Sequence, residues 1–328
     1  MNMLIPVLLF ALGLVLLIKG GDWFVDGATG IAERFHVPEL IIGATVVSIG
    51  TTLPEVMVSA TSALTGHGEI AYGNAIGSII CNTALIAALT VAIRPGPVDT
   101  KALKTPVLFF FGSAAIYVSN AYVTGYFGRP LGILLLAIFV VYLVVTVRQG
   151  FKNPAGAAAE EAGAVEEEAA KNSMVKDILL LVIGAALVAL GADLLVDNGT
   201  LIAQALGVPE SVIALTFVAL GTSLPELVTA ITSLAKGHGS LSLGNVIGAN
   251  IFNLVLVSGA SMTLAPFRIP QSSTLFGVNS SLVLDVPLML FVMALLTLPA
   301  LKTKKLSRCQ GIVLLILYAA FCGIQFSM

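Results

Sequence analysis

Long apolar runs dominate the chain and alternate with short segments that carry glycine, proline or charge. A helix needs about 20 apolar residues to cross the hydrocarbon core of a bilayer. The first run ends at Lys19 without a small-residue cleavage site, so we expect a retained helix rather than a signal peptide. The pattern predicts an all-α membrane protein with ten transmembrane helices, near residues 3–20, 40–63, 70–93, 105–123, 130–148, 175–195, 211–234, 241–263, 284–301 and 309–326.

The chain also contains an internal duplication. A shift of 171 residues aligns 43–85 with 214–256 without a gap, and nineteen of the 43 aligned positions are identical. Each copy carries five spans, an odd number, so the second copy must enter the membrane in the opposite orientation. The sequence therefore predicts two inverted-topology five-helix repeats over 1–148 and 175–328, joined by an acidic cytoplasmic linker over 149–174.

Inverted repeats are typical of secondary transporters, in which substrate sites lie near the membrane midplane at the repeat interface. Channels and membrane enzymes can also be duplicated, so the repeat favours transport without proving it. The composition, 57% hydrophobic and 10% charged, makes the lipid bilayer the main partner. A net charge of -2 excludes a nucleic-acid partner, because no basic surface is available for phosphates.

Lysine and arginine are distributed unequally between the two sides of the predicted membrane. The loops after odd-numbered spans hold fourteen of the 16 basic residues, and the other side holds Arg129 and Arg268. Cytoplasmic loops carry the excess of positive charge. We therefore expect both termini to be external. The absence of a large cytoplasmic domain favours the plasma membrane of a prokaryote.

Glu55 and Glu226 are the two carboxylates predicted to lie in the middle of hydrophobic spans, at equivalent positions of the two repeats. An ionisable group at this depth costs about 2.5–3.5 kcal/mol on insertion scales, so it is a candidate functional residue. A protonated acid that bonds to a neighbouring helix is the structural alternative. Two acids without an intramembrane Lys or Arg supply the charge that a divalent cation needs, so a cation is the expected ligand.

Oxygen-bearing residues surround each acid. Pro54 and Pro225 lack an N–H group, so we expect the helices to open near Gly50 and Gly221 and to free carbonyl oxygens. Hydroxyl, carboxylate and carbonyl oxygens are the ligands of Ca²⁺, and the absence of His and Cys disfavours a transition metal. The neighbouring positions within about two turns of each acid are Ser48, Thr51 and Thr52 in the first repeat, and Ala219, Thr222 and Ser223 in the second.

The spans that follow carry amides at a four-residue spacing. Asn74, Ser78 and Asn82 share one helix face in the first repeat, and Asn245 and Asn253 occupy equivalent positions in the second. Ligation and helix packing are equal alternatives for Asn74 and Asn245, because Asn and Gly-x-x-x-Gly also join membrane helices. For Ser78, Asn82 and Asn253 we favour ligation.

The doubled motifs resemble the two alpha repeats of the cation/calcium antiporter superfamily, and specifically those of a prokaryotic sodium/calcium exchanger. The resemblance rests on Gly-Thr-Thr-Leu-Pro-Glu at 50–55, Gly-Thr-Ser-Leu-Pro-Glu at 221–226, and the Gly-Asn-x-x-Gly segment that follows each. It implies a secondary active transporter without enzymatic activity or cofactor, which moves Ca²⁺ and Na⁺. It also implies that helices 1 and 6 slide across the core.

The resemblance further implies a ligand set between helices 2, 3, 7 and 8. This set comprises the carboxylates of Glu55 and Glu226, the hydroxyls of Thr51, Thr52, Thr222 and Ser223, the side chains of Ser78, Asn82 and Asn253, and the main-chain oxygens of Ser48 and Ala219. Asp replaces Asn253 in members associated with potassium co-transport, so potassium dependence is not expected. Ala249 stands where Ser is common, which removes one hydroxyl ligand.

Three alternatives to sodium/calcium antiport remain open. Proton/calcium antiport would use Glu55 and Glu226 as proton carriers, although the Gly-Asn-x-x-Glu pattern typical of that branch is absent. A passive cation channel would conduct without a counter-ion. An intramembrane metalloprotease would need a His-Glu-x-x-His helix, and the sequence has none.

Overall fold

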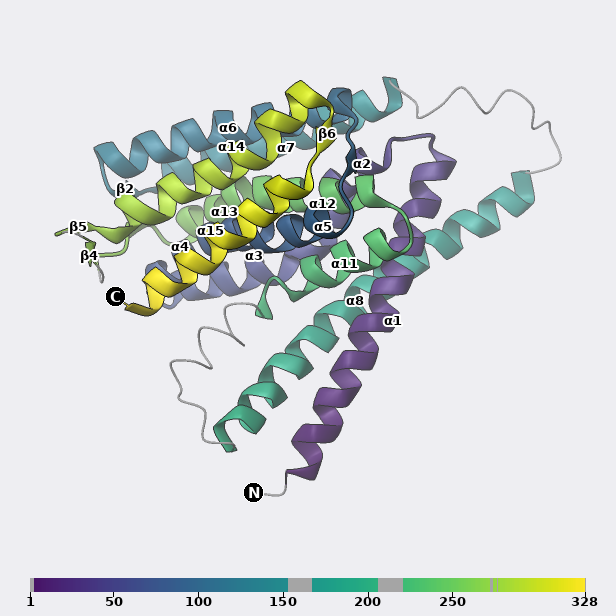
Figure 1. The fold of residues 1–328 in the computed structure, drawn as a ribbon, viewed down its shortest axis with the longest axis horizontal. Coiled ribbons are helices and arrows are strands. Elements are labelled where there is room, and N and C mark those ends of the chain that lie inside the picture. Colours follow the sequence, from purple (N-terminus) through teal and green to yellow (C-terminus); the bar gives the residue numbers. More distant parts are fainter. Residues whose placement is uncertain (1–2, 153–166, 206–220, 272–273, 276, 328) are drawn as a thin grey trace.

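In the computed structural model the chain is almost entirely helical (Figure 1). The structure describes residues 3–152, 167–205, 221–271, 274–275 and 277–327. Nine helices in this part are long and apolar enough to cross a membrane, and a shorter apolar helix, α11 (Leu224–Ala235), lies in the predicted seventh span. Residues 211–220 of that span, including Ala219, are outside the described residues. The predicted all-α, multi-pass fold is confirmed.

The two longest helices, α1 (Leu4–Arg34) and α8 (Glu167–Ala205), lie side by side and run obliquely to the other helices (Figure 1). α1 continues through Lys19, where the sequence predicted a loop, and its 31 residues extend about 46 Å. Along this extension, Lys236 Nζ lies 2.7 Å from Asp26 Oδ1, which connects the polar half of α1 to the residue that follows α11.

Glycines form the contact surface between α1 and α8. A Cβ atom on Gly13 would lie 2.9 Å from the carbonyl oxygen of Gly191, and one on Gly20 would lie 3.0 Å from that of Gly184. The facing residue numbers rise on α1 as they fall on α8, so the two helices are antiparallel. The backbones approach closely because no side chain separates them. We call this line of glycine contacts between α1 and α8 the glycine seam.

The second, third and eighth spans form the centre of the molecule. The second comprises α2 (Glu39–Ile42), the π-helical segment η1 (Gly43–Val47) and α3 (Ser48–Leu64). The third comprises α4 (Gly68–Cys81), η2 (Asn82–Ala87) and α5 (Ala88–Ile93), and the eighth comprises α12 (Gly239–Phe252), η4 (Asn253–Val257) and α13 (Ser258–Leu264). η2 and η4 occupy equivalent positions of the two repeats.

α12 packs closely against the second span in a parallel direction. A Cβ atom on Gly244 would lie 2.9 Å from Leu40 Cα, and one on Gly248 would lie 2.6 Å from Ala44 Cα. Both residue numbers rise together, as expected for two even-numbered spans that cross the membrane in the same direction. The Gly-x-x-x-Gly spacing on α12 therefore serves helix packing.

The remaining helices surround this centre, and short strands join the two repeats. The helices are α6 (Thr100–Val123), α7 (Arg129–Lys152), α14 (Val286–Thr303), which follows the π-helical segment η5 (Ser281–Asp285), and α15 (Arg308–Ser327). β1 (Gly96–Pro97) pairs with β6 (Lys305–Leu306), β2 (Tyr126–Phe127) with β3 (Phe267–Arg268), and β4 (Thr274–Leu275) with β5 (Val278–Asn279). The first two pairings each connect a loop of one repeat to a loop of the other.

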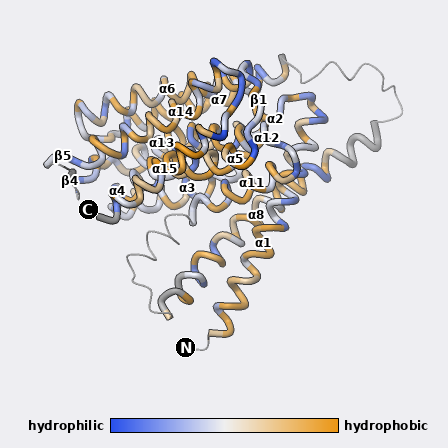
Figure 2. Tube along the Cα trace, viewed as in Figure 1, coloured by the Kyte–Doolittle hydropathy of each residue, from blue (hydrophilic) through white to orange (hydrophobic). Residues whose placement is uncertain are grey.

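Polar residues gather at the two ends of the helical bundle, near β1 and α2 at one end and near β4 and β5 at the other (Figure 2). The outer helices between these ends are mostly apolar (Figure 2). Many large apolar side chains on α1, α7 and α8 are exposed, including Leu8, Val140 and Ile183. Such a band of exposed apolar side chains is the surface that a bilayer covers.

Candidate cation site

The two glutamates of the doubled motif are fully buried, on α3 and in the first turn of α11. Thr52 Oγ1 on α3 donates to Glu226 Oε1 at 3.5 Å, which joins the two motifs. Both carboxylate oxygens of Glu55 and Oε2 of Glu226 have no hydrogen-bond partner in the described part of the chain. The ion pairs found in that part involve neither acid.

Burying a carboxylate without a partner is costly, because its charged form loses the surrounding water and gains nothing in return. Such an acid must either bind a cation or take up a proton. Glu226 also lies in the first turn of α11, where the helix dipole favours negative charge. The arrangement can therefore hold two negative charges in the protein interior when a cation neutralises them.

Asn82 and Asn253 begin the π-helical segments η2 and η4. Both side chains are fully buried, and neither their amide nitrogens nor their carbonyl oxygens have a partner in the part of the chain described. A π-helical turn contains one extra residue and frequently marks a functional site. Two equivalent turns that present unpartnered amide oxygens support the expectation that these two residues are ligands.

The predicted hydroxyl ligands are mostly buried. Thr51, Thr52 and Ser223 are each at most 2% exposed, and Ser78 is 5% exposed. Ser223 Oγ has no partner within the described ranges. Thr222 is half-buried, in the turn before α11. The main-chain oxygen of Ala219 falls outside the described residues. Ligation by this set stays a prediction.

The expected opening of the helix near Gly50 is wrong for the first repeat. α3 continues from Ser48 to Leu64 with Pro54 inside it. The irregularity lies one turn earlier, in η1, where the Ser48 hydroxyl donates to the carbonyl of Gly43 at 2.7 Å. In the second repeat a turn at 222–223 precedes α11, whose first turn contains Pro225. Proline is well tolerated at a helix start, where its missing N–H costs no bond.

Asn74 and Asn245 connect helices of opposite repeats. Thr51 Oγ1 donates to Asn245 Oδ1 at 3.2 Å, and the equivalent Thr222 Oγ1 donates to Asn74 Oδ1 at 3.2 Å. Asn74 also donates to the main-chain oxygen of Glu55 at 3.2 Å. Of the two alternatives left open for these asparagines, the hydrogen bonds support helix packing. They also fix the threonines beside the acids.

Sequence reasoning missed two hydroxyls on the glutamate face of α11. Thr229 and Ser233 lie three and seven residues after Glu226, so all three share one face of the helix. Both hydroxyls are fully buried and have no partner in the described part of the molecule. The i, i+3, i+7 spacing was visible in the sequence, but it also describes ordinary helix packing.

The oblique pair of helices touches both motifs. A Cβ atom on Gly50 would lie 3.0 Å from the ring of Phe24 on α1, and one on Gly221 would lie 2.7 Å from the side chain of Val196 on α8. Each long helix thus contacts the glycine that begins a motif. A displacement of either helix would change the surroundings of the neighbouring acid.

Comparison with known proteins finds a matching family model and relatives that align over nearly the whole chain. The model of the family described as sodium/calcium exchanger protein matches residues 5–148 and 176–327. A membrane protein of Methanocaldococcus jannaschii is 38% identical over 314 residues, which cover 94% of each chain. The sodium/calcium exchanger MaX1 of Methanosarcina acetivorans is 30% identical over 97% of this chain and 98% of its own.

Among solved structures, the sodium-calcium exchanger NCX_Mj, soaked with Na⁺ and Sr²⁺, superposes with a TM-score of 0.80 and 36% identity. The match covers 97% of this chain and 98% of that one. The two-repeat helical fold is therefore shared. The chain belongs to the sodium/calcium exchanger family.

Proposed function

We propose that this chain exchanges Na⁺ for Ca²⁺ across the membrane by alternating access, with Glu55 and Glu226 binding the cations. The observation that carries the proposal is the pair of fully buried carboxylates with three unpartnered oxygens in the described part of the chain. Two negative charges offset the dehydration of one divalent cation. The oxygens of Asn82, Asn253 and the motif hydroxyls would complete a coordination shell of six to eight oxygens.

Exchange follows if Na⁺ and Ca²⁺ compete for these oxygens. The empty site carries uncompensated charge, so a conformational change that buries it further is costly. When Ca²⁺ or Na⁺ occupies the site, its negative charge is neutralised, so the conformational change is permitted. The contacts of Phe24 with Gly50 and of Val196 with Gly221 support α1 and α8 as the moving pair, because their glycine seam lets them move together.

The proposal includes the predicted orientation and organisation. Both termini would be external, the repeats would span 1–148 and 175–328, and the linker over 149–174 would be cytoplasmic. The described ends of α7 and α8 extend helically into that linker, to Lys152 and from Glu167. The prokaryotic origin of the M. acetivorans and M. jannaschii relatives supports a prokaryotic plasma membrane.

The test is ⁴⁵Ca²⁺ uptake into proteoliposomes under three conditions. The vesicles are loaded with Na⁺, loaded with K⁺, or prepared with a pH gradient across the membrane. We expect uptake from Na⁺-loaded vesicles that is at least about tenfold faster than from K⁺-loaded vesicles. Uptake driven by the pH gradient alone would assign the chain to proton/calcium antiport. Uptake that is indifferent to all gradients would indicate a channel and would contradict antiport.

A further inference from the structure

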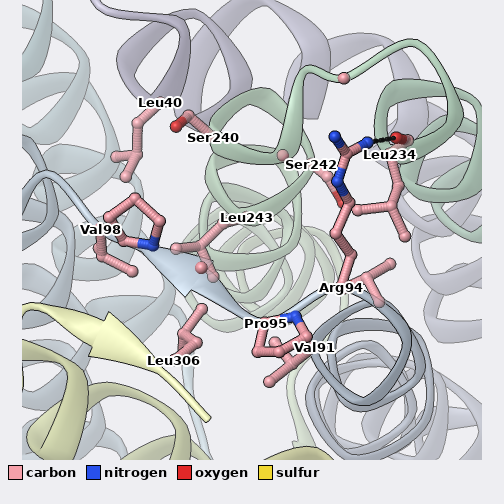
Figure 3. Close-up of a pocket in the computed structure, with 15 residues that line it drawn as sticks. Leu40, Val91, Arg94, Pro95, Val98, Leu234, Ser240, Ser242, Leu243 and Leu306 are labelled. Carbon is pink, nitrogen blue, oxygen red and sulfur yellow. Dashed lines mark hydrogen bonds between the residues drawn. The ribbon is translucent and has the colours of Figure 1, made fainter. Parts of the chain in front are cut away.

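A pocket of about 260 Å³ lies at the end of the bundle that carries β1 and α2 (Figure 3), and neither Glu55 nor Glu226 lines it. Its lining comes from the ends of three spans. Arg94 directly follows the third span, Leu40 is the second residue of the second span, and Ser240 is the second residue of the eighth. Because transmembrane spans end at the interface, the pocket lies at the depth of lipid headgroups.

Three groups in this pocket suit an anion. Arg94 contributes a guanidinium, of which Nη1 donates to the carbonyl of Leu234 at 3.2 Å (Figure 3). α12 begins at Gly239 with no side-chain cap, so the amides of its first turn are available as donors. Ser242, which also lines the pocket, is 2% exposed, and its Oγ has no partner within the described ranges.

The two acids that adjoin lining residues in the sequence have polar partners. Glu39, which precedes Leu40, lies 2.7 Å from His238 Nδ1 through its Oε1. Asp99, which follows the lining residue Val98, caps α6 by accepting from the amides of Lys101 and Ala102. The rim adds positive charge, because Lys305 and Arg308 line an adjoining hollow beyond β1 and β6.

The rest of the lining is apolar. Leu40, Val91, Leu243 and Leu306 are each at most 8% exposed and face the same cavity as the polar groups (Figure 3). A cation would meet the Arg94 charge here, so the pocket is unsuited to be an entrance for Ca²⁺. An arginine, a helix N-terminus and hydroxyls beside apolar side chains match a phosphate group attached to a hydrocarbon.

We propose that this pocket binds a phosphate group and that its occupant in the membrane is the headgroup of an anionic phospholipid. The phosphate accepts from Arg94, from the first amides of α12 and from Ser242, while the acyl chains cover the apolar side. The excess of Lys and Arg on this side places it in the cytoplasmic leaflet. The lipid would join α5 to the loop between α11 and α12.

To test this, the purified full-length protein in a phosphate-free detergent is titrated with short-chain phosphatidylglycerol, with short-chain phosphatidylcholine or with inorganic phosphate. The thermal midpoint and the number of lipids retained in native mass spectrometry are measured. We expect phosphatidylglycerol to stabilise the protein and Arg94→Gln to raise its half-saturating concentration at least about tenfold, the loss of one charged hydrogen bond. Stabilisation by inorganic phosphate as well would identify the phosphate itself as the recognised group.

Two variants distinguish loss of the site from loss of the fold. Ser242→Ala removes a hydroxyl without a partner, so the lipid-free midpoint stays the same or rises while the phosphatidylglycerol shift falls. Arg129→Gln is the matched control, because Arg129 also donates to a main-chain carbonyl, at 3.2 Å, beside a different loop. The proposal is overturned if Arg94→Gln and Arg129→Gln respond alike, or if phosphatidylcholine stabilises as well as phosphatidylglycerol.

Discussion

Asn250 and Asn253 lie three residues apart in the eighth span but have different surroundings. Asn250 Nδ2 donates to Thr83 Oγ1 at 2.7 Å and joins α12 to η2. Asn253 begins η4, and neither of its polar atoms has a partner in the described part of the chain. A buried amide without a partner weakens the fold unless a ligand uses it. Asn250 therefore has a structural contact, whereas a binding role for Asn253 stays a prediction.

We predict opposite effects of the same substitution at these two positions. Asn250→Leu removes the donor to the Thr83 hydroxyl, which keeps its own hydrogen bond to the carbonyl of Ile79, so we expect stability to fall by about 0.5–1.5 kcal/mol. Asn253→Leu leaves stability unchanged or higher in cation-free buffer, but it reduces the stabilisation that saturating Ca²⁺ provides. Thermal unfolding in detergent with and without Ca²⁺ measures both. An Asn253→Leu protein that keeps the full Ca²⁺-dependent shift would show that this amide is not a ligand.

The backbones of α1 and α8 pack directly against each other where glycines face each other. A Cβ atom on Gly191 would lie 2.8 Å from both Gly13 O and Leu17 N, which are backbone atoms that cannot move aside. A Cβ atom on Gly112 of α6 would meet nothing within 4 Å. The two glycines thus have the same intrinsic helix propensity and opposite steric surroundings.

Gly191→Val is therefore expected to separate α1 from α8. Overpacking should lower stability by about 1–3 kcal/mol, and Na⁺-driven Ca²⁺ uptake should be slower. Gly112→Val, the matched control, is expected to retain uptake within about twofold. Uptake and thermal midpoints of both purified variants measure the difference. Normal transport by Gly191→Val would contradict a mechanism that needs this seam.

Elements that depend on local pattern were predictable from the sequence, and elements that depend on tertiary contacts were not. Hydropathy and self-similarity are properties of the chain itself, so the spans and the duplication follow from them. The polar half of α1 contacts α8 and Lys236, which lies 210 residues from Asp26, and such contacts are not visible in local sequence. Charges within 19–34 therefore ended the apolar run without ending the helix.

The candidate site shows the same limit. Buried carboxylates at equivalent positions follow from sequence alone, because charge within an apolar run is conspicuous. The π-helical turns at Asn82 and Asn253 leave no clear sequence signal, since one extra residue does not change composition. Pro54 was expected to open its helix, but α3 tolerates it, and the irregularity lies in η1. The roles of Asn74 and Asn245 depended on contacts between repeats.

For the whole molecule, the excess of Lys and Arg on one side predicts the orientation, and a native cysteine can test it. Cys309 is exposed and lies next to Arg308 at the start of α15, whereas Cys81 is buried. This end of α15 belongs to a loop predicted to be cytoplasmic.

A membrane-impermeant maleimide should therefore label Cys309 in inside-out vesicles and not in right-side-out ones. Cys309→Ser identifies the labelled residue, and Thr124→Cys in that background supplies an exposed site on the opposite side. Labelling of Cys309 in right-side-out vesicles would reverse the assigned topology, with both termini then inside.

We propose that Glu55 and Glu226, at equivalent positions of the two repeats, form one Na⁺-sensitive Ca²⁺ site. Equilibrium ⁴⁵Ca²⁺ binding to the purified protein, with and without competing Na⁺, tests it most directly. Removing one partner of a buried ionic contact costs about 3–5 kcal/mol, so Glu55→Gln and Glu226→Gln should each weaken binding by at least about 100-fold.

Asp285→Asn is the matched control, because Asp285 lies within the ninth span but accepts from Gln325 at 3.0 Å. It should bind Ca²⁺ as the unmodified chain does. We expect Na⁺ to displace Ca²⁺ from the unmodified protein and from Asp285→Asn. Unchanged Ca²⁺ affinity in either glutamine variant, or binding that Na⁺ does not affect, would contradict the account.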